Sequence, residues 1–404
     1  MTIGMFKRGA NRRDVIKGIA ATATFTLAAP AILRAQESAI HIGTLTPLTG
    51  AGGPYGPVMA DAVRKVVDEV NAAGVLGREI ILVSEDSQTS PEAAVRAARK
   101  LIDVDNVSAI IGTWASAVTT AVAPMAWESE RMLFTVSGAD SITQLPHNGY
   151  IIRTQPNTTL QGQKFGEYAV ELGDRRVFFL TPQTPFADSQ YTTIKAAVEA
   201  AGGEVERLIY DDKKPSLRSE LDQALRFDPD MLILGGYTPD TTVLLRDIYR
   251  AGYEGHLLGF AYSINQDLIG GLPAEVVEGA YTLAPSPAEG GTAYDRLAGL
   301  VGIDVPDTYT CQVYDHINLA LMAIAHAGGS SGTEIRDSVR EVSQGGGMEV
   351  DNAVAGIEAI LAGEKVDYAG ASGPCEFNEI GDITDASFRY EQVVGGAIEL
   401  LKIA

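Results

Sequence analysis

The sequence contains few of the residues on which enzymes and metal centres depend. Its 404 residues include five histidines and two cysteines, and the histidines are scattered without the spacing of zinc ligands. An H-E-x-x-H motif and a Walker motif are missing. The one G-x-S-x-G match, GGSSG at 328–332, lies in a glycine-rich break between two predicted helices and not in the strand-to-helix turn of a nucleophile elbow. These absences argue against a hydrolase, a zinc enzyme and a P-loop nucleotide-binding protein. We therefore expect a protein that is not an enzyme and that needs no cofactor and no metal.

Positive charge is scarce as well. The chain has 31 Lys and Arg residues against 52 Asp and Glu residues, a formal net charge of −21. Residues 1–35 hold six of the basic residues and one of the acidic ones, which leaves 25 bases and 51 acids in the rest of the chain. Such an excess of negative charge repels nucleic acid and anionic lipid. We expect a freely diffusing protein with no nucleic-acid partner.

The first 35 residues have the pattern of an export signal. The segment NRRDVIK at 11–17 is a twin-arginine motif, and a weakly apolar stretch at 18–33 follows it, with Ala35 at the end. Sixteen residues rich in Ala and Thr are too short and too polar to span a bilayer comfortably. We predict a twin-arginine signal peptide at 1–35, export to the periplasm, and no stable insertion in the membrane.

The two cysteines, Cys311 and Cys375, do not form a C-x-x-C pair, and no histidine lies near them at metal-ligand spacing. Exported proteins meet an oxidising environment, in which disulfides persist. A structural disulfide between Cys311 and Cys375 is therefore favoured over two buried thiols.

Residues 40–86 predict a βαβ unit. β-branched and apolar residues at 40–45 indicate a strand, and a turn with four glycines follows, whose spacing departs from the G-x-G-x-x-G of dinucleotide sites. After this turn, apolar residues recur at helical spacing until Gly74, and a second strand begins at Ile80. A right-handed βαβ crossover implies a parallel sheet, in which ligands bind beyond the carboxyl ends of the strands.

The alternation of strand and helix occurs twice along the chain. The first series covers residues 40–140, pauses at 150–157, and is followed by a second series at 177–269. After Pro285 the pattern becomes mainly helical, and the last residues form a β-type tail at 388–401. Two series of similar length predict an α/β protein with two doubly wound parallel-sheet lobes.

Small, hydroxyl or aromatic residues recur just past the predicted strands. Each one alone is more simply explained as a turn residue or as a ring that covers the edge of a core. Six such loops, divided between two lobes, favour a cleft for a small molecule, lined by rings and a few hydrogen-bond donors. Ser116 opens a helix, so its hydroxyl and the next backbone N–H groups could hold a carboxylate. The candidate residues are Tyr55, Trp114, Ser116, Ser137, Ala139, Phe186, Tyr237 and Tyr262.

Several segments together resemble the type I periplasmic solute-binding proteins of the leucine/isoleucine/valine-binding class, which serve ATP-driven importers. The resemblance covers residues 40–404, and only the combination of segments is specific. The segments are PLTGAGGPYG (47–56), VNAAGVLGREIILVSED (70–86), IIGTWAS (110–116), FADS (186–189), GGYTPD (235–240) and GPCEFNEIGDI (373–383).

The resemblance implies two lobes joined by three hinge crossovers, near Asn157, 285–289 and 385–387. Proteins of this class close their lobes around a small solute, and the permease subunits of an ABC transporter recognise the closed form. The implied boundaries are 36–157 with 286–386 for lobe one, and 158–285 with 387–404 for lobe two.

The resemblance also implies roles for individual residues. Ser116 and the backbone from Ser137 through Gly138 to Ala139 would hold a carboxylate. The pocket would be lined by Tyr55, Trp114, Phe186 and Tyr237.

Two positions depart from the pattern of the amino-acid binders. Those proteins place a carboxylate, usually Glu, where this chain has Ala261 and Tyr262, and a hydroxyl residue that helps to hold the ammonium aligns with Ala139. An ammonium buried without a charged partner is costly, unless Asp140 turns towards it. The sequence therefore predicts a small amphipathic acid or amide, which could be aromatic, with branched-chain amino acids as the competing ligands.

Two other functions remain open from the sequence. An exported receptor of the same fold would report a ligand to a membrane kinase. An exported α/β hydrolase is the second alternative, and the missing nucleophile elbow disfavours it.

Overall fold

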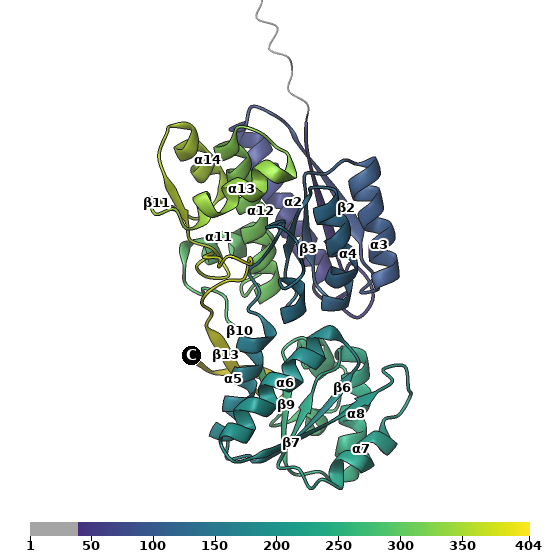
Figure 1. Cartoon of the computed structure of the whole chain (residues 1–404). Coiled ribbons are helices and arrows are strands. Elements are labelled where there is room, and N and C mark those ends of the chain that lie inside the picture. Colours follow the sequence, from purple (N-terminus) through teal and green to yellow (C-terminus); the bar gives the residue numbers. More distant parts are fainter. Residues whose placement is uncertain (1–38) are drawn as a thin grey trace, which may run out of the picture. The chain divides into compact units, whose positions relative to one another are not determined.

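The computed structural model describes residues 39–404, so the predicted signal peptide lies outside the described residues. Two large sheets organise this part of the chain, and a two-stranded sheet accompanies them (Figure 1). The first large sheet has five strands in the order β2-β1-β3-β4-β5, and all its pairings are parallel. Its strands are β1 (Ile40–Thr46), β2 (Ile80–Asp86), β3 (Ala109–Thr113), β4 (Met132–Thr135) and β5 (Ile151–Arg153).

The predicted βαβ unit at the start of the chain is confirmed. Strand β1 pairs in parallel with β2 over their whole length, and α2 (Gly56–Ala73) connects them. One face of α2 is apolar and buried, and the helix ends at Gly74, whose φ of 63° lies in the left-handed region that glycine adopts without strain.

Helices cover both faces of the first sheet. Helix α3 (Pro91–Arg99) packs against α4 (Ser116–Glu128), and on the other side α12 (Thr308–Ala327) packs against α2 (Figure 1). The remaining helices of this group, which adjoin α2 or α12, are α11 (Thr292–Val301), α13 (Gly332–Ser343) and α14 (Ala353–Leu361). The small sheet pairs β11 (Met348–Val350) with β12 (Val366–Tyr368).

The second large sheet has seven strands in the order β14-β13-β10-β9-β8-β6-β7. Five are parallel, whereas the two strands of the tail pair antiparallel, so the sheet is mixed. Its strands are β6 (Arg176–Pro182), β7 (Glu204–Tyr210), β8 (Met231–Leu234), β9 (His256–Phe260), β10 (Tyr281–Pro285), β13 (Phe388–Val394) and β14 (Ala397–Ile403). The predicted α/β class with parallel sheets is confirmed.

Six helices accompany the second sheet within the described residues. They are α5 (Thr158–Glu171), α6 (Pro185–Ala200), α7 (Arg218–Leu225), α8 (Thr238–Ala251), α9 (Gln266–Gly270) and α10 (Ala274–Val277). Helix α5 was not predicted from the sequence, because Gly162 and Gly166 interrupt its helical pattern. These glycines let α5 approach α6 closely: a Cβ at Gly166 would lie 2.5 Å from the Cβ of Ala197.

The chain passes three times between the elements of the two large sheets, at 154–157, at 286–291 and at 384–387. We propose that these passages are the hinge crossovers. The lobes would then have the boundaries expected above, with 36–157 and 286–386 in lobe one and 158–285 and 387–404 in lobe two. No helix among residues 39–404 is long and apolar enough to cross a bilayer.

The predicted disulfide between Cys311 and Cys375 is wrong, because both cysteines are free buried thiols in the structure. The Cys311 sulfur faces the carbonyl of Pro306 at 4.0 Å, whereas the Cys375 sulfur faces the carbonyl of Gly373 at 3.7 Å. Burial raises the pKa of both thiols, which keeps them protonated and unreactive.

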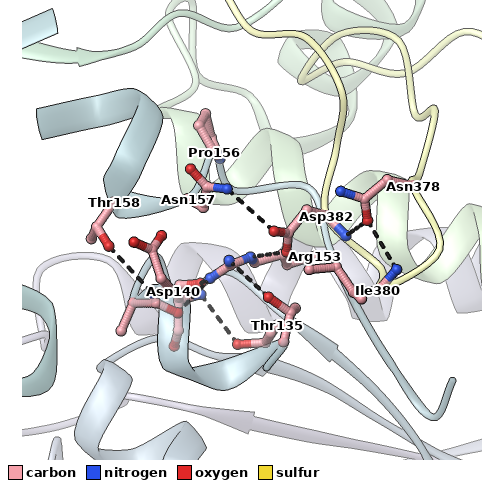
Figure 2. A network of polar contacts seen from close by, with 12 residues as sticks. Thr135, Asp140, Arg153, Pro156, Asn157, Thr158, Asn378, Ile380 and Asp382 are labelled. Atoms are coloured by element: carbon pink, nitrogen blue, oxygen red, sulfur yellow. Dashed lines mark hydrogen bonds and ion pairs between the residues drawn. The ribbon is translucent and has the colours of Figure 1, made fainter. Parts of the chain in front are cut away.

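A buried ion pair joins Arg153, just before the first passage, to Asp382, just before the last one (Figure 2). Arg153 is fully buried at the end of β5, and its Nε donates to Asp382 at 2.7 Å. The other carboxylate oxygen of Asp382 accepts from Asn157. The Arg153 Nη1 donates to the carbonyls of Ala139 at 2.7 Å and Ser137 at 3.2 Å. One guanidinium therefore fixes two of the passages and the loop that follows β4.

Removal of the Asp382 carboxylate would leave the buried Arg153 guanidinium without a counterion. We expect Asp382→Ala to lower the free energy of unfolding by about 3–5 kcal/mol, measured by urea denaturation. The matched control is Asp385→Ala, since Asp385 is exposed and its side chain bonds only the backbone of the next residue. The control should lose no more than about 0.5 kcal/mol. Equal losses in the two variants would contradict this account.

Candidate functional site

Aromatic rings from both large sheets meet beyond the carboxyl ends of the strands. Trp114 follows β3 of the first sheet, while Tyr237 and Tyr262 follow β8 and β9 of the second. The ring centroid of Trp114 lies 5.6 Å from that of Tyr237 and 5.8 Å from that of Tyr262. Phe186, near the start of α6, lies edge-on to Tyr262 at 5.9 Å. These distances are those of favourable aromatic pairs.

The rings enclose a cavity of about 30 Å³. Six residues that were predicted from the sequence line it: Trp114, Ser116, Gly138, Phe186, Tyr237 and Tyr262. The structure thus brings together residues from five separate loops, as the expectation of a ring-lined cleft requires.

Hydrogen-bond donors form one wall of this cavity. Helix α4 begins at Ser116 with no side-chain cap and no acidic residue in its first turn, so its first backbone N–H groups are free to bind an anion. The Ser116 Oγ accepts from the backbone N–H of Ala139 at 3.2 Å, which leaves the hydroxyl proton available. Among the described residues, the backbone N–H of Gly138 has no hydrogen-bond partner. Ser116 and Gly138 line the same cavity, so these donors are available to a carboxylate there.

Gly138 is required at this wall for a steric reason. A Cβ on Gly138 would lie 2.8 Å from the Phe186 ring and 2.8 Å from the Gln161 amide. The glycine therefore lets the Phe186 ring approach the donor wall closely.

Three predicted residues lie outside the lining of this cavity. Ser137 is buried and its hydroxyl donates to the carbonyl of Trp114 at 2.8 Å, so it supports the wall from behind. Ala139 is also buried. Its backbone N–H donates to the Ser116 hydroxyl oxygen, and its carbonyl accepts from the Arg153 guanidinium. Tyr55 stacks on Trp114 at 5.8 Å, but its hydroxyl points away, towards the carbonyl of Ala261 and the amide of Asn265.

Six lining residues were not among the candidates from the sequence. The most important is Tyr309, whose ring lies edge-on to Trp114 at 5.6 Å. It sits in the first turn of α12, which follows no strand, so a search of strand ends could not find it. The Asp307 carboxylate accepts from the backbone N–H of Tyr309 and so starts the helix there, a capping signal that the sequence does contain. The other five are Ala115, Val136, Gln155, Thr184 and Gly235.

Among the described residues that line the cavity, none carries a charge. Asp140, which could have reached an ammonium, is bound elsewhere: its carboxylate accepts from the N–H and hydroxyl of Thr159 and from the Ser189 hydroxyl. Within residues 39–404, no three His, Cys, Asp or Glu side chains lie together as a metal site would need. The site can hold an anion and an apolar group, but it offers an ammonium no counterion.

A buried carboxylate lies behind the second lobe's side of the site. Asp240 accepts from the Tyr210 hydroxyl at 2.6 Å and from the backbone N–H of Tyr237 at 2.9 Å. Burial raises the pKa of the Asp240 carboxyl to about 6. The two hydrogen bonds lower this pKa, but their effect is smaller than that of burial. Asp240 therefore holds the backbone of the cavity residue Tyr237 in place.

Comparison with known proteins settles the family. A family model described as periplasmic binding protein matches residues 39–362. The chain belongs to this family. Among curated relatives, a Leu/Ile/Val-binding protein, BraC3, of Rhizobium johnstonii is 23% identical and covers 95% of this chain and 98% of its own length. A chemotactic signal transduction system substrate-binding protein, BasB, of Halobacterium salinarum is 26% identical. This match covers 83% of this chain and 82% of BasB.

Solved structures agree with this assignment at the level of the fold. The leucine-binding protein LivK of Thermotoga maritima superposes with a TM-score of 0.77 at 24% identity, covering 90% of this chain and 98% of its own. An ABC transporter solute-binding protein of R. palustris, solved in complex with benzoate, has a TM-score of 0.73 at 18% identity. This match covers 91% of this chain and 96% of the R. palustris protein. The chain is thus a type I periplasmic binding protein of the leucine/isoleucine/valine-binding class, as the sequence segments indicated.

The raised pKa of Asp240 makes a prediction about stability and pH. Because the folded protein binds this proton more tightly than the unfolded chain, Asp240 contributes stability at low pH that is lost as the pH rises through about 6. We expect the free energy of unfolding of the wild type, relative to Asp240→Asn, to fall by about 1 kcal/mol between about pH 5 and pH 7. Denaturant unfolding at both pH values measures this difference.

The control for this experiment is Asp295→Asn, at an exposed position on α11. Its stability relative to the wild type should be the same at both pH values. An Asp240→Asn protein that behaves in the same way would show that Asp240 does not bind a proton in this range.

Proposed function

We propose that this protein is the extracytoplasmic solute-binding component of an ABC importer, and that it binds a small carboxylate with an apolar group and no α-ammonium. The observation that carries the proposal is a cavity with donors on one wall, aromatic rings on the others and no charged lining residue. We further propose that the donors hold the carboxylate and the rings cover the apolar group.

The charges around the cavity distinguish between two classes of solute. An amino acid would bring its ammonium into a region where burial is costly without a counterion, and neither Tyr262 nor Ala261 can supply one. A solute with a carboxylate and no ammonium avoids this cost. Its carboxylate still accepts hydrogen bonds from the Ser116 hydroxyl and from the backbone N–H groups at the N-terminus of α4. The two similar structures are a leucine-binding protein and a protein solved with benzoate. Leucine and benzoate both have a carboxylate, and of the two only benzoate lacks an ammonium.

The importer role rests on the family and on the hinge. Rings from the two sheets contact each other across the cavity, so a solute bound there would touch both lobes and favour their closure. Permease subunits that bind the closed form are the proposed partners. Export to the periplasm, through the twin-arginine signal at 1–35, is part of the same proposal.

A sensory role is the second candidate, because one relative is named as a chemotactic substrate-binding protein. Uptake of a labelled solute by cells that lack this protein separates the two roles. Loss of uptake supports the importer, whereas normal uptake with loss of chemotaxis supports the sensor.

Matched solutes test the proposed ligand class. Leucine and 4-methylpentanoate share the carboxylate and the branched side chain, and they differ in the α-ammonium. We expect 4-methylpentanoate to bind at least about tenfold more tightly in isothermal titration calorimetry, because it buries no unpaired charge. Submicromolar binding of leucine with weaker binding of 4-methylpentanoate would contradict the proposal.

The same assay tests the carboxylate wall. We expect Ser116→Ala to weaken the binding of 4-methylpentanoate by about tenfold, the loss of one hydrogen bond to a charged group. Thr120→Ala is a suitable control one turn along α4, since its hydroxyl bonds the backbone of Ser116 and Thr120 does not line the cavity. Equal affinities for the two variants would place the carboxylate elsewhere.

A further inference from the structure

A second cavity shares two of the rings with the first. Its volume is about 450 Å³, and Tyr262 and Tyr309 line both this cavity and the first one. Tyr55 belongs to its wall, which explains why this predicted residue faces away from the first cavity. Most of the wall is apolar, including Phe260, Leu283, Ala284, Pro285, Pro287 and Ile398.

The two cavities differ in what they can hold. The first has about 30 Å³, so it can hold the carboxylate end of a solute but not an elongated body. Pockets for small molecules usually measure about 300–1,000 Å³. The second cavity is in this range but lacks the free N-terminus of α4 and Ser116. Donors and space are therefore found in two cavities that share Tyr262 and Tyr309.

The charges of the second cavity are largely matched within the protein. Arg389 pairs with Glu391 and with Glu289, and the Asp307 carboxylate accepts from two backbone N–H groups and the Thr310 hydroxyl of α12. Two carboxylates and one guanidinium in the lining leave this cavity slightly acidic. A second carboxylate on a solute would be repelled here, whereas an apolar group would lie against the prolines and rings.

We propose that the two cavities form one binding site for an elongated monocarboxylate. The carboxylate lies at Ser116 and the N-terminus of α4, and the apolar body passes between Tyr262 and Tyr309 into the second cavity. This inference rests on the proposed function and adds the length and the charge of the solute. The second cavity includes Pro285 and Pro287, so a body of this kind would also contact the middle hinge passage.

A series of acids tests the length of the site. Benzoate, 3-phenylpropionate and 5-phenylvalerate share one carboxylate and one ring, and differ in the number of methylene groups between them. We expect 5-phenylvalerate to bind the mature protein at least about tenfold more tightly than benzoate in calorimetry, since each buried methylene adds to the affinity. Affinity that falls or stays constant along the series overturns the inference.

Variants that fill the second cavity test where the body lies. Val305 lines this cavity and is 61% exposed, and Ala261 lines it at a turn. We expect Val305→Trp and Ala261→Phe each to weaken 5-phenylvalerate by about tenfold and benzoate by less than about twofold. The matched control is Val104→Trp, at an exposed position that lines neither cavity, and it should change neither affinity.

The outcomes separate this inference from the function on which it rests. If benzoate and 3-phenylpropionate bind as well as 5-phenylvalerate, and both filling variants keep all three affinities, the inference is wrong and the carboxylate-binding function stands. If 4-methylpentanoate binds but none of the three acids does, the inference is wrong and the function stands. If neither 4-methylpentanoate nor any of the three acids binds, the proposed function fails and the inference fails with it. Circular dichroism on each variant excludes unfolding as the cause of a lost affinity.

Discussion

The ion pair of the buried Arg153 guanidinium is the interaction on which both the donor wall of the site and the passages beside it depend. A fully buried positive charge is tolerated only when its donors are satisfied, and here they bind Asp382, the Thr143 hydroxyl and the carbonyls of Ser137 and Ala139. Asp382 lies 229 residues from Arg153 along the chain, so the ion pair joins two segments that are far apart in sequence. The donor wall of the cavity therefore has the same fixed position as the hinge passage beside it.

The site combines this fixed wall with rings that are held mainly by one another. Trp114 contacts rings from both lobes, with Tyr55 and Tyr309 on its own side and Tyr237 and Tyr262 on the other. Stacking and edge-on contacts have broad energy minima compared with charged hydrogen bonds. A rigid anchor for one group beside an adaptable apolar lining is a combination that suits solute capture with domain closure.

Much of the fold could be predicted because its signals are local. The apolar periodicity of α2, its Gly74 stop and the alternation of strands and helices all appear within short windows of sequence. Helix α5 was missed because Gly162 and Gly166, which allow its close contact with α6, interrupt the helical pattern of apolar residues. The disulfide was predicted wrongly because cysteine count and compartment say nothing of the distance between Cys311 and Cys375.

The sequence by itself determined the fold class, the absence of catalytic motifs and the six candidate residues that do line the cavity. The fold class follows from the periodicity of the apolar residues. The candidate residues follow from the rule that ligands bind beyond the carboxyl ends of parallel strands. Only the tertiary structure decided that Tyr309 joins them, that Ser137 and Ala139 stand behind the wall, and that Tyr55 faces a second cavity. The reason is physical: side-chain direction and the space between elements depend on packing across the whole chain, which no local pattern encodes.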